Sequence, residues 1–299
     1  MSVEKPKLRI LTGPTAAGKT EQALRWAESV GGEILSCDSV CVYRGLDVGS
    51  AKPTVAERSR IPHHGINLAE PAERFSVTAY IAHARKVVDD AARRGKPLLV
   101  TGGSGFYLAA FFGPVADNLD IPEAASEEAR RLQGEGLEAL RNRLLQLEGG
   151  RLPDWLDADN PIRLAKALER RLASGQPLDQ LRETFLAQPG AFADLTVETE
   201  LLDRPDVELR TRIARRTRAM LGGGLIDEAR WLDAQGLDDT LPAMRAVGYR
   251  EAIAWVRARE SGSTEGLAEA IDRATWHLVT KQRKWFRRLG LGRKTPEAG

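Results

Sequence analysis

A glycine-rich loop near the start of the chain contains residue types that bind phosphate. Residues 13–20 fit the pattern G-x-x-x-x-G-K-[ST] at every fixed position. Glycines let the backbone bend around a phosphate, whose charge then meets free N–H groups and the positive end of a following helix. We predict that Lys19 reaches the outer phosphate oxygens and that the Thr20 hydroxyl binds Mg²⁺. The predicted diphosphate-binding residues are Gly13, Pro14, Thr15, Ala16, Ala17, Gly18, Lys19 and Thr20.

A carboxylate directly follows the second apolar stretch of the chain. Residues 33–37 are predicted to form a strand, which places Asp38 at its carboxyl end. In open α/β sheets ligands bind at that edge, and the phosphate loop must occupy the same edge. We therefore predict that Asp38 acts as a base or a metal-shell ligand. The alternative is that Asp38 and Ser39 only cap a helix or a turn.

Three glycines and a hydroxyl end a later apolar stretch. Residues 97–101 are predicted to form a buried strand, which runs into Gly102-Gly103-Ser104-Gly105. Nucleotide hydrolases commonly place a metal-binding Asp after such a strand, and no carboxylate is present here. The glycines suggest a close approach to a ligand. An ordinary glycine-rich turn is the alternative.

These residues require a sheet that brings strand ends together. An apolar run at residues 8–11 predicts the strand before the phosphate loop, and an amphipathic helix follows it. Between about residues 115 and 200 the chain becomes helical and predominantly acidic, with a helix start at Asn160-Pro161. We predict an α/β fold, a P-loop NTPase-like parallel sheet core with a helical insertion domain. The core takes residues 1–117 and 200–299, and the insertion takes residues 118–199.

Composition narrows the class of protein. The 299 residues are 42% hydrophobic and 29% charged, as in soluble globular proteins. No run approaches the length of a membrane span, and the first residues lack the apolar stretch of a secretory signal. Two cysteines give no disulfide framework and fit a reducing cytosol. We expect a cytoplasmic protein without membrane contact.

Basic residues cluster in two predicted helices, although the formal net charge is only +2. Residues 206–220 are rich in arginine, and residues 272–294 carry eight Lys or Arg against one acid, interleaved with aromatics. Basic residues neutralise phosphates, and aromatic rings stack on unpaired bases. We expect Arg283 and Arg287, one helical turn apart, to bind RNA phosphates. The alternative is an ordinary amphipathic helix whose aromatic side chains face the core.

Eight segments in a fixed order form a more specific pattern. They are GPTAAGKT, DSVCVYRGLDVGSAKPT, IPHHGINLAEPAERFS, LLVTGGSGFY, NPIRLAKALE, the Arg212-Ile213-x-x-Arg216 helix with its distal GL..EA, LPAMRAVGYRE and KQRKWFR. Through them the chain resembles the tRNA dimethylallyltransferase (isopentenyl-tRNA transferase) family over almost its entire length. The resemblance implies transfer of a dimethylallyl group from its diphosphate to N6 of the tRNA adenosine just 3′ of the anticodon.

The resemblance also implies roles for individual residues. Asp38 would be the base that is hydrogen-bonded to N6, while the phosphate loop, Mg²⁺ and Arg216 would stabilise the departing diphosphate. Ser104 stands where the family has Thr, which places a hydroxyl near the adenine and the diphosphate. The implied catalytic residues are Asp38, Ser104, Lys19 and Arg216. The implied partners are dimethylallyl diphosphate and the anticodon stem-loop of tRNA, and we expect a monomer.

Several segments correspond to those that touch tRNA in the family. This chain has Cys41 where the family usually has Gln, which replaces two donors and an acceptor with a weakly interacting thiol. Ser104 keeps the Thr hydroxyl but loses the methyl group that restricts its rotamer. The implied tRNA-binding residues are Asp38, Ser39, Val40, Cys41, Ser104, Arg130, Ile162, Arg163, Leu164, Ala165, Lys166, Arg245, Ala246, Val247, Gly248, Tyr249 and Arg250.

Two other functions compete with prenyl transfer. A P-loop nucleotide or nucleoside kinase would share the phosphate loop and Asp38. An RNA-binding homologue with weakened catalysis would account for Cys41 and Ser104. Transfer of phosphate from ATP to a nucleoside would support the first, whereas a prenylated tRNA nucleoside would exclude both.

Overall fold

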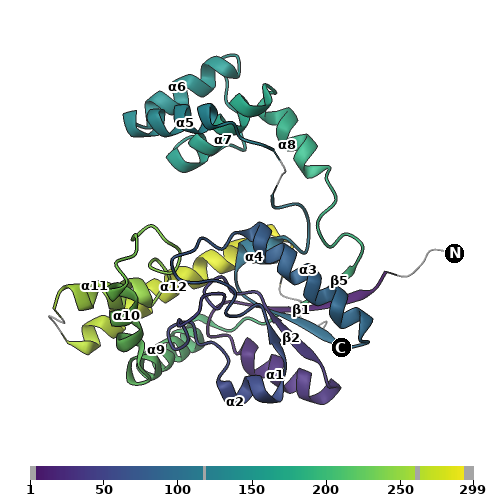
Figure 1. Ribbon diagram of the computed structural model, residues 1–299, viewed down its shortest axis with the longest axis vertical. Helices are drawn as coiled ribbons and strands as arrows, with labels where there is room; N and C mark the ends of the chain where they lie inside the picture. Colours follow the sequence, from purple (N-terminus) through teal and green to yellow (C-terminus); the bar gives the residue numbers. More distant parts are fainter. Residues whose placement is uncertain (1–4, 117–118, 260–262, 293–299) are drawn as a thin grey trace. The chain divides into compact units, whose positions relative to one another are not determined.

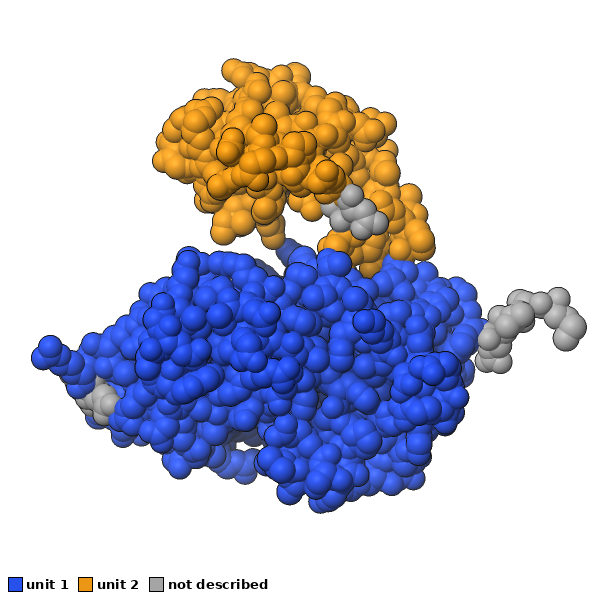
Figure 2. Space-filling model, viewed as in Figure 1, with its two compact units in different colours: residues 1–112, 190–299 blue, residues 113–189 orange. Residues whose placement is uncertain are grey.

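The computed structural model describes residues 5–116, 119–259 and 263–292. The chain divides into two compact units, one of residues 1–112 with 190–299 and the other of residues 113–189 (Figure 2). The predicted start of the insertion at residue 118 lies outside the described residues. Its predicted end at residue 199 is too late, because strand β5 (Thr196–Leu201) pairs with the first strand of the sheet and belongs to the first unit.

A five-stranded parallel sheet forms the centre of the first unit (Figure 1). Its strand order is β3-β2-β4-β1-β5. Besides β5 the strands are β1 (Lys7–Thr12), β2 (Glu33–Ser36), β3 (His63–His64) and β4 (Leu98–Gly102). The predicted α/β fold with a parallel sheet core is thus confirmed. Because parallel strands share one carboxyl edge, the residues that follow β1, β2 and β4 lie together.

Alternate residues of the strands face two different layers of helices. Ile10, Leu35 and Val100 join a buried hydrophobic cluster with the apolar face of α3 (Val77–Arg93). Their neighbours Leu11, Ile34 and Leu99 join a separate cluster with Ala23 and Ala27 of α1 (Lys19–Val30). Near-continuous apolar runs such as residues 98–100 are therefore buried on both faces, as is typical of parallel sheets.

The C-terminal part of the first unit is helical. Helix α9 packs against α12, and α10 packs against α11. Helix α12 begins at Thr264 rather than at the predicted Asp272, with the Ser263 side chain accepting a hydrogen bond from the Gly266 amide. In the described part of the chain, no helix combines the length and apolar character needed to cross a membrane. The remaining helices of this unit are α2 (Val55–Arg60), α4 (Gly105–Ala109), α9 (Asp206–Gly222), α10 (Leu225–Ala234), α11 (Tyr249–Arg257) and α12 (Thr264–Arg288).

The second unit is a helical bundle with a hydrophobic core of its own. Leucines of different helices, including Leu140, Leu164 and Leu168, are fully buried in it. The predicted helix start at Asn160 is confirmed, since its side chain accepts hydrogen bonds from the two amides at residues 162 and 163. The helices are α5 (Glu123–Glu135), α6 (Leu137–Leu147), α7 (Pro161–Ser174) and α8 (Leu178–Leu186).

Stacked rings join the two chain segments that flank this insertion. Phe111 precedes the insertion and Phe192 follows it, and both side chains are buried in the core of the first unit. Their ring centroids are 4.5 Å apart. The sheet unit therefore fixes the two ends of the insertion close together.

Gly102, at the end of β4, lies too close to the residue after β2 to carry a side chain. A Cβ atom on Gly102 would lie 2.1 Å from the carbonyl oxygen of Cys37. We expect Gly102→Ala to lower the free energy of unfolding by about 1–3 kcal/mol, because the backbone must shift. Urea denaturation would measure this loss.

The control is Gly134→Ala in α5, where a Cβ atom would meet nothing within 4 Å. Alanine should stabilise that helix by up to about 1 kcal/mol. An unchanged unfolding midpoint for Gly102→Ala would contradict the close approach of the two strand ends.

Candidate active site

Side chains from distant segments hold the backbone of the loop between β1 and α1. Arg204 donates from Nε to the Ala17 carbonyl at 2.6 Å, and Arg212 donates to the Ala16 carbonyl at 2.7 Å. The Thr15 amide donates to Gln282 Oε1 at 2.9 Å. Because a trans peptide directs its C=O and N–H oppositely, the Gly18 amide points away from Arg204. The loop is thereby shaped to present an amide to an anion.

The two fixed glycines of the loop have different structural roles. A Cβ atom on Gly13 would lie 2.0 Å from the Leu202 carbonyl oxygen, so the end of β5 excludes a side chain there. Gly18 has a φ of 104°, a left-handed conformation that glycine adopts without strain. The pattern therefore reflects close packing at one glycine and backbone conformation at the other.

Lys19 lies folded back on its own loop. Its ammonium donates to the carbonyls of Gly13 and Pro14, each at 2.8 Å. Burial lowers the pKa of Lys19 from 10.5 to about 8, opposed by Asp38, which raises it, and assisted by Arg216, which lowers it. The three charges are thus close enough to influence one another. A phosphate would replace two neutral carbonyls with a charged partner.

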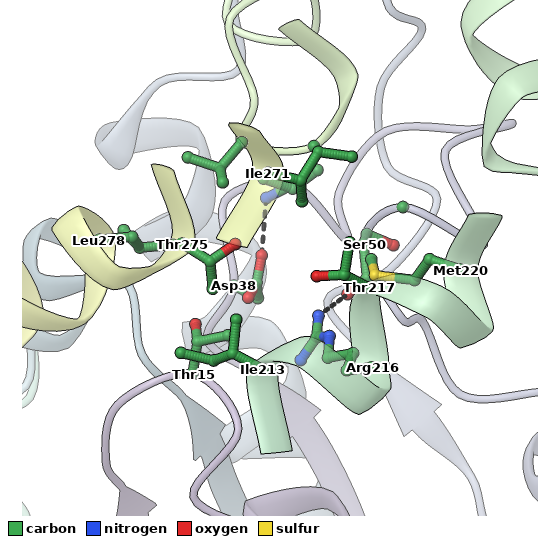
Figure 3. Close-up of a pocket in the computed structure, with 14 residues that line it drawn as sticks. Thr15, Asp38, Ser50, Ile213, Arg216, Thr217, Met220, Ile271, Thr275 and Leu278 are labelled. Atoms are coloured by element: carbon green, nitrogen blue, oxygen red, sulfur yellow. Dashed lines mark hydrogen bonds between the residues drawn. The ribbon is translucent and has the colours of Figure 1, made fainter. Parts of the chain in front are cut away.

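Asp38 both caps a turn and faces a cavity. Its Oδ1 accepts hydrogen bonds from the amides of Val40 at 2.8 Å and Cys41 at 3.3 Å. The same residue lines the cavity shown in Figure 3. The two alternatives raised from the sequence are therefore compatible, since one oxygen holds the turn while the carboxylate remains at the cavity wall.

Arg216 of α9 lies on the wall of the same cavity (Figure 3). Its guanidinium donates a long hydrogen bond, 3.4 Å, to the Ser50 carbonyl. Burial lowers the pKa of Arg216, while Asp38 and then Cys41 act in the opposite direction. Arg216 is thus a weakly solvated cation beside a carboxylate.

The cavity has a volume of about 70 Å³ and two kinds of wall. Charged and hydroxyl side chains form one part, and the rest is formed by Val40, which follows β2, and by apolar side chains of the C-terminal helices and their connections. An arrangement of this kind suits a small ligand with a charged end and a hydrocarbon end. The polar residues are Thr15, Asp38, Ser50, Arg216, Thr217 and Thr275, and the apolar side chains are Val40, Ile213, Met220, Val247, Ile271 and Leu278.

Packing accounts for the glycines at the end of β4 and just after it. Gly102 lies against Cys37, a Cβ atom on Gly103 would lie 2.5 Å from Gln282 Nε2, and one on Gly105 would lie 2.3 Å from the Trp285 ring. Close approach of other parts of the protein is thus sufficient to account for the glycines of this run. Ser104 is half-buried and precedes α4, but it does not line the cavity.

Comparison with known proteins places the chain in a family. The sequence profile described as IPP transferase matches residues 41–289, and the profile described as isopentenyl transferase matches residues 6–74. The chain belongs to the IPP transferase family. A tRNA dimethylallyltransferase of Opitutus terrae is 48% identical to it, covering 96% of this chain and 91% of the relative. One of Geobacter metallireducens is 37% identical, covering 95% and 91%.

Solved structures of similar fold lead to the same family. The tRNA isopentenylpyrophosphate transferase of Bacillus halodurans has a TM-score of 0.66 and 29% identity, over 95% of this chain and 87% of that chain. A eukaryotic dimethylallyltransferase acting on tRNA has a TM-score of 0.76 over 94% of this chain and 70% of that chain; at 20% identity it supports the fold alone. These relatives support prenyl transfer rather than the nucleotide kinase or the weakened RNA-binding homologue.

Not every side chain of the family's RNA-contacting segments is exposed. In the first segment Ser39 is exposed, whereas Cys41 is buried, and burial raises the pKa of its thiol well above the ordinary value. In the later segment Arg245 and Arg250 are exposed, Ala246 and Tyr249 are buried, and Val247 and Gly248 line the cavity. The thiol of Cys41 is therefore buried inside the protein and is not presented to an RNA base. The Gln that the family usually has here would be expected to form hydrogen bonds to RNA.

The helical unit shows a similar division. On α7 the side chains of Ile162, Arg163 and Lys166 are exposed, while Leu164 and Ala165 belong to the buried core of that unit. Arg130 of α5 is exposed and paired with Glu123. The exposed residues remain candidates for contact with tRNA.

Arg283 has a structural role that its sequence context did not reveal. Its guanidinium pairs with Asp203 at 2.9 Å and with Asp206 at 2.7 Å, and it also donates to the Arg204 carbonyl. Arg283 was expected to bind an RNA phosphate. In the structure its guanidinium is instead engaged in ion pairs that tie α12 to the start of α9. Arg287 is exposed, whereas Arg293 and Lys294 lie outside the described residues.

The roles of Arg204 and Gln282 in holding the loop are not indicated by the sequence. Gln282 lies within the family segment KQRKWFR, but nothing in its spacing indicates the Thr15 amide as a partner. Among the aromatics nearby, Phe286 is buried, Trp276 carries the Arg210 guanidinium 3.8 Å from its ring centroid, and Trp285 meets Phe106 edge to face. All three rings have partners within the protein.

The lowered pKa of Lys19 predicts that burial of its ammonium costs stability in the free protein. Because the unfolded chain binds the proton more tightly between about pH 8 and 10.5, the free energy of unfolding contributed by Lys19 should rise with pH in that window. We expect Lys19→Met to be more stable than wild type at pH 7 by on the order of 1–2 kcal/mol. Urea denaturation at several pH values would measure the difference.

The same variant should lose its stability advantage by about pH 10.5 and should bind pyrophosphate poorly at every pH. Lys284→Met, at an exposed position of α12, is the control. If wild type proved more stable than Lys19→Met at pH 7, the hydrogen bonds of Lys19 to its loop would outweigh the cost of burial.

Proposed function

We propose that the chain transfers a dimethylallyl group from dimethylallyl diphosphate to N6 of the tRNA adenosine just 3′ of the anticodon, releasing diphosphate. The names of the relatives support both the prenyl group and the tRNA acceptor. One observation supports the proposal from this chain itself: Asp38 and Arg216 face a small cavity whose other walls are largely apolar. A five-carbon chain joined to a diphosphate has matching chemistry.

Asp38 is the proposed base. The exocyclic amine of adenine is a poor nucleophile, because its lone pair is delocalised into the ring. In the proposed step a bond forms between N6 and C1 of the prenyl group, the C1–O bond to diphosphate breaks, and Asp38 takes the proton from N6. Since Asp38 Oδ1 is fixed by the amides of Val40 and Cys41, the carboxylate is oriented before the substrate arrives.

Lys19 and Arg216 are the proposed stabilisers of the leaving group. The diphosphate gains negative charge as the C1–O bond breaks, and preorganised cations in a poorly hydrated site stabilise such charge strongly. The lowered pKa values of Lys19 and Arg216, each caused chiefly by burial, report that poor hydration. The loop amides would bind the same anion.

Thr20 is the residue that would hold Mg²⁺ together with the substrate. Its hydroxyl is exposed in the first turn of α1 and makes no hydrogen bond within the described residues. The described part of the chain has no group of three His, Cys, Asp or Glu that could hold a metal. A single hydroxyl still fits, because Mg²⁺ keeps several waters and binds phosphate oxygens. The ion would neutralise part of the diphosphate charge.

The role of Asp38 can be tested without disturbing the turn. In Asp38→Asn the amide oxygen can still accept from the Val40 and Cys41 amides, but the side chain cannot take a proton. We expect the single-turnover rate of prenyl transfer to fall by about 10²–10⁴, with tRNA affinity within several-fold of wild type. Mass spectrometry of tRNA nucleosides would follow the product.

Asp89→Asn, on the exposed face of α3, is the matched control and should transfer at the wild-type rate. A near-normal rate for Asp38→Asn would show that this carboxylate is only a cap. A wild-type chain that fails to prenylate undermodified tRNA would refute the proposed function itself.

The exposed basic side chains of α12 are expected to bind tRNA phosphates. Lys284 and Arg287 make no ion pair within the described residues and lie three positions apart on the helix. Replacing both by Gln should weaken tRNA binding and lower the slope of log affinity against log salt by about one to two units, because each phosphate contact adds roughly 0.7–0.9. Binding at several salt concentrations would measure it.

Arg283→Gln is the matched comparison on the same helix. Because Arg283 is paired with Asp203 and Asp206, its loss should reduce stability and leave the salt slope unchanged. An unchanged slope for the Lys284/Arg287 variant would mean that RNA binds elsewhere.

A further inference from the structure

The carboxylate of Glu228, which lies outside the cavity, accepts four hydrogen bonds. Glu228 of α10 accepts from three consecutive backbone amides: Asp47 at 2.9 Å, Val48 at 2.8 Å and Gly49 at 3.1 Å. The Tyr249 hydroxyl donates to the same carboxylate at 2.5 Å. Three successive N–H groups that converge on one anion form a nest, and here the anion belongs to the protein.

Tyr249 packs against the same loop, and its hydroxyl accepts a hydrogen bond from the Gly49 amide at 3.1 Å. Its ring is fully buried, and a Cβ atom on Gly49 would lie 2.5 Å from it. Burial, followed by the contact with Glu228, raises the pKa of Tyr249, so the phenol remains a donor to the carboxylate. The implied contact of Tyr249 with tRNA is therefore replaced by a contact inside the protein.

The segment held in this way forms part of the cavity wall. Gly49 and Ser50 line the cavity, and the Ser50 carbonyl accepts the hydrogen bond of Arg216. Tyr249 comes directly after Val247 and Gly248 in the chain, and these two residues also line the cavity. One carboxylate thus joins two wall segments that are distant in sequence.

We propose that Glu228 is a positioning residue, which fixes the loop at residues 47–50 so that the Ser50 carbonyl orients Arg216 toward the diphosphate. This inference rests on the proposed function. Glu228 does not line the cavity and acts only through the loop and Arg216. Displacement of a group by about 1 Å can cost about 10²-fold in rate, so the loss of this clamp should reduce transfer without removing any contact to substrate.

Glu228→Gln is the first test, because an amide cannot accept hydrogen bonds at both of its terminal atoms. We expect faster hydrogen exchange at the amides of residues 47–49 and a single-turnover rate lower by about 10- to 100-fold, with tRNA affinity unchanged. The matched control is Asp227→Asn on the same helix, whose carboxylate pairs with Arg230 and does not contact the loop. It should leave exchange and rate at wild-type values.

A double-mutant cycle separates positioning from a merely structural role. If Glu228 acts through Arg216, adding Glu228→Gln to Arg216→Lys should lower the rate by no more than about threefold beyond Arg216→Lys alone. A full additional loss in the double variant would overturn the inference, as would a wild-type rate for Glu228→Gln with exchange accelerated. If Glu228→Gln does not fold, Tyr249→Phe serves in the same cycle, because it removes both the hydrogen bond to Glu228 and the one that the Tyr249 hydroxyl accepts from the Gly49 amide at 3.1 Å.

The readouts also distinguish this inference from the proposed function. If wild type transfers no prenyl group, the proposed function fails, but amide exchange and affinity for inorganic pyrophosphate can still be compared between variants. Weaker pyrophosphate binding by Glu228→Gln, absent in the Arg216→Lys background, would support the clamp. The clamp would be refuted if Glu228→Gln left pyrophosphate affinity unchanged in both the wild-type and the Arg216→Lys backgrounds.

Discussion

The phosphate loop keeps its shape because side chains from the C-terminal third of the chain bind its backbone. Arg204 and Arg212 donate hydrogen bonds to two adjacent carbonyls, and Gln282 accepts one from the Thr15 amide. Residues 13–18 are glycine, proline, threonine and alanine, which offer little side-chain surface with which the loop could order itself. Ordering each residue costs about 1–2 kcal/mol of conformational entropy. The site therefore depends on helices α9 and α12 as much as on the loop itself.

The C-terminal helices also bring positive charge to the site that the protein itself does not fully neutralise. Arg283 pairs with Asp203 and Asp206 and thereby ties α12 to the start of α9, the helix that carries Arg212 and Arg216. Lys19 and Arg216 remain incompletely compensated, and burial lowers the pKa of each. An anionic ligand would supply the missing partner, so binding and local stability are coupled at this site.

Sequence reasoning succeeded where short-range patterns decide the structure. The phosphate pattern, the apolar strands and the Asn160 cap are local, and the structure contains each of them. It failed where a tertiary partner decides the role. In the sequence Arg283 resembles any other basic residue, and only the fold shows that Asp203 lies beside it. Likewise Tyr249 lies in a segment expected to contact RNA, and only the fold shows that its hydroxyl donates a hydrogen bond to Glu228.

The glycines after β4 illustrate the same limit. Their number suggested a ligand, because glycine permits close approach, yet the groups that approach are Cys37, Gln282 and Trp285. A run of glycines indicates that another group lies close to the backbone, but the sequence does not reveal whether that group is a ligand or another part of the protein. The boundary of the insertion was misplaced for a related reason, since the alternating pattern of residues 196–201 gains meaning only from its pairing with β1.

The stacked pair of Phe111 and Phe192 has a consequence for how the helical unit can vary. In polymer terms the insertion is a loop whose two ends are already held together by the fold that carries it. Loop closure then adds only about 0.6 kcal/mol for each doubling of loop length. Because the helices also bury a separate core, the unit can be lengthened, shortened or exchanged at little thermodynamic cost to the sheet.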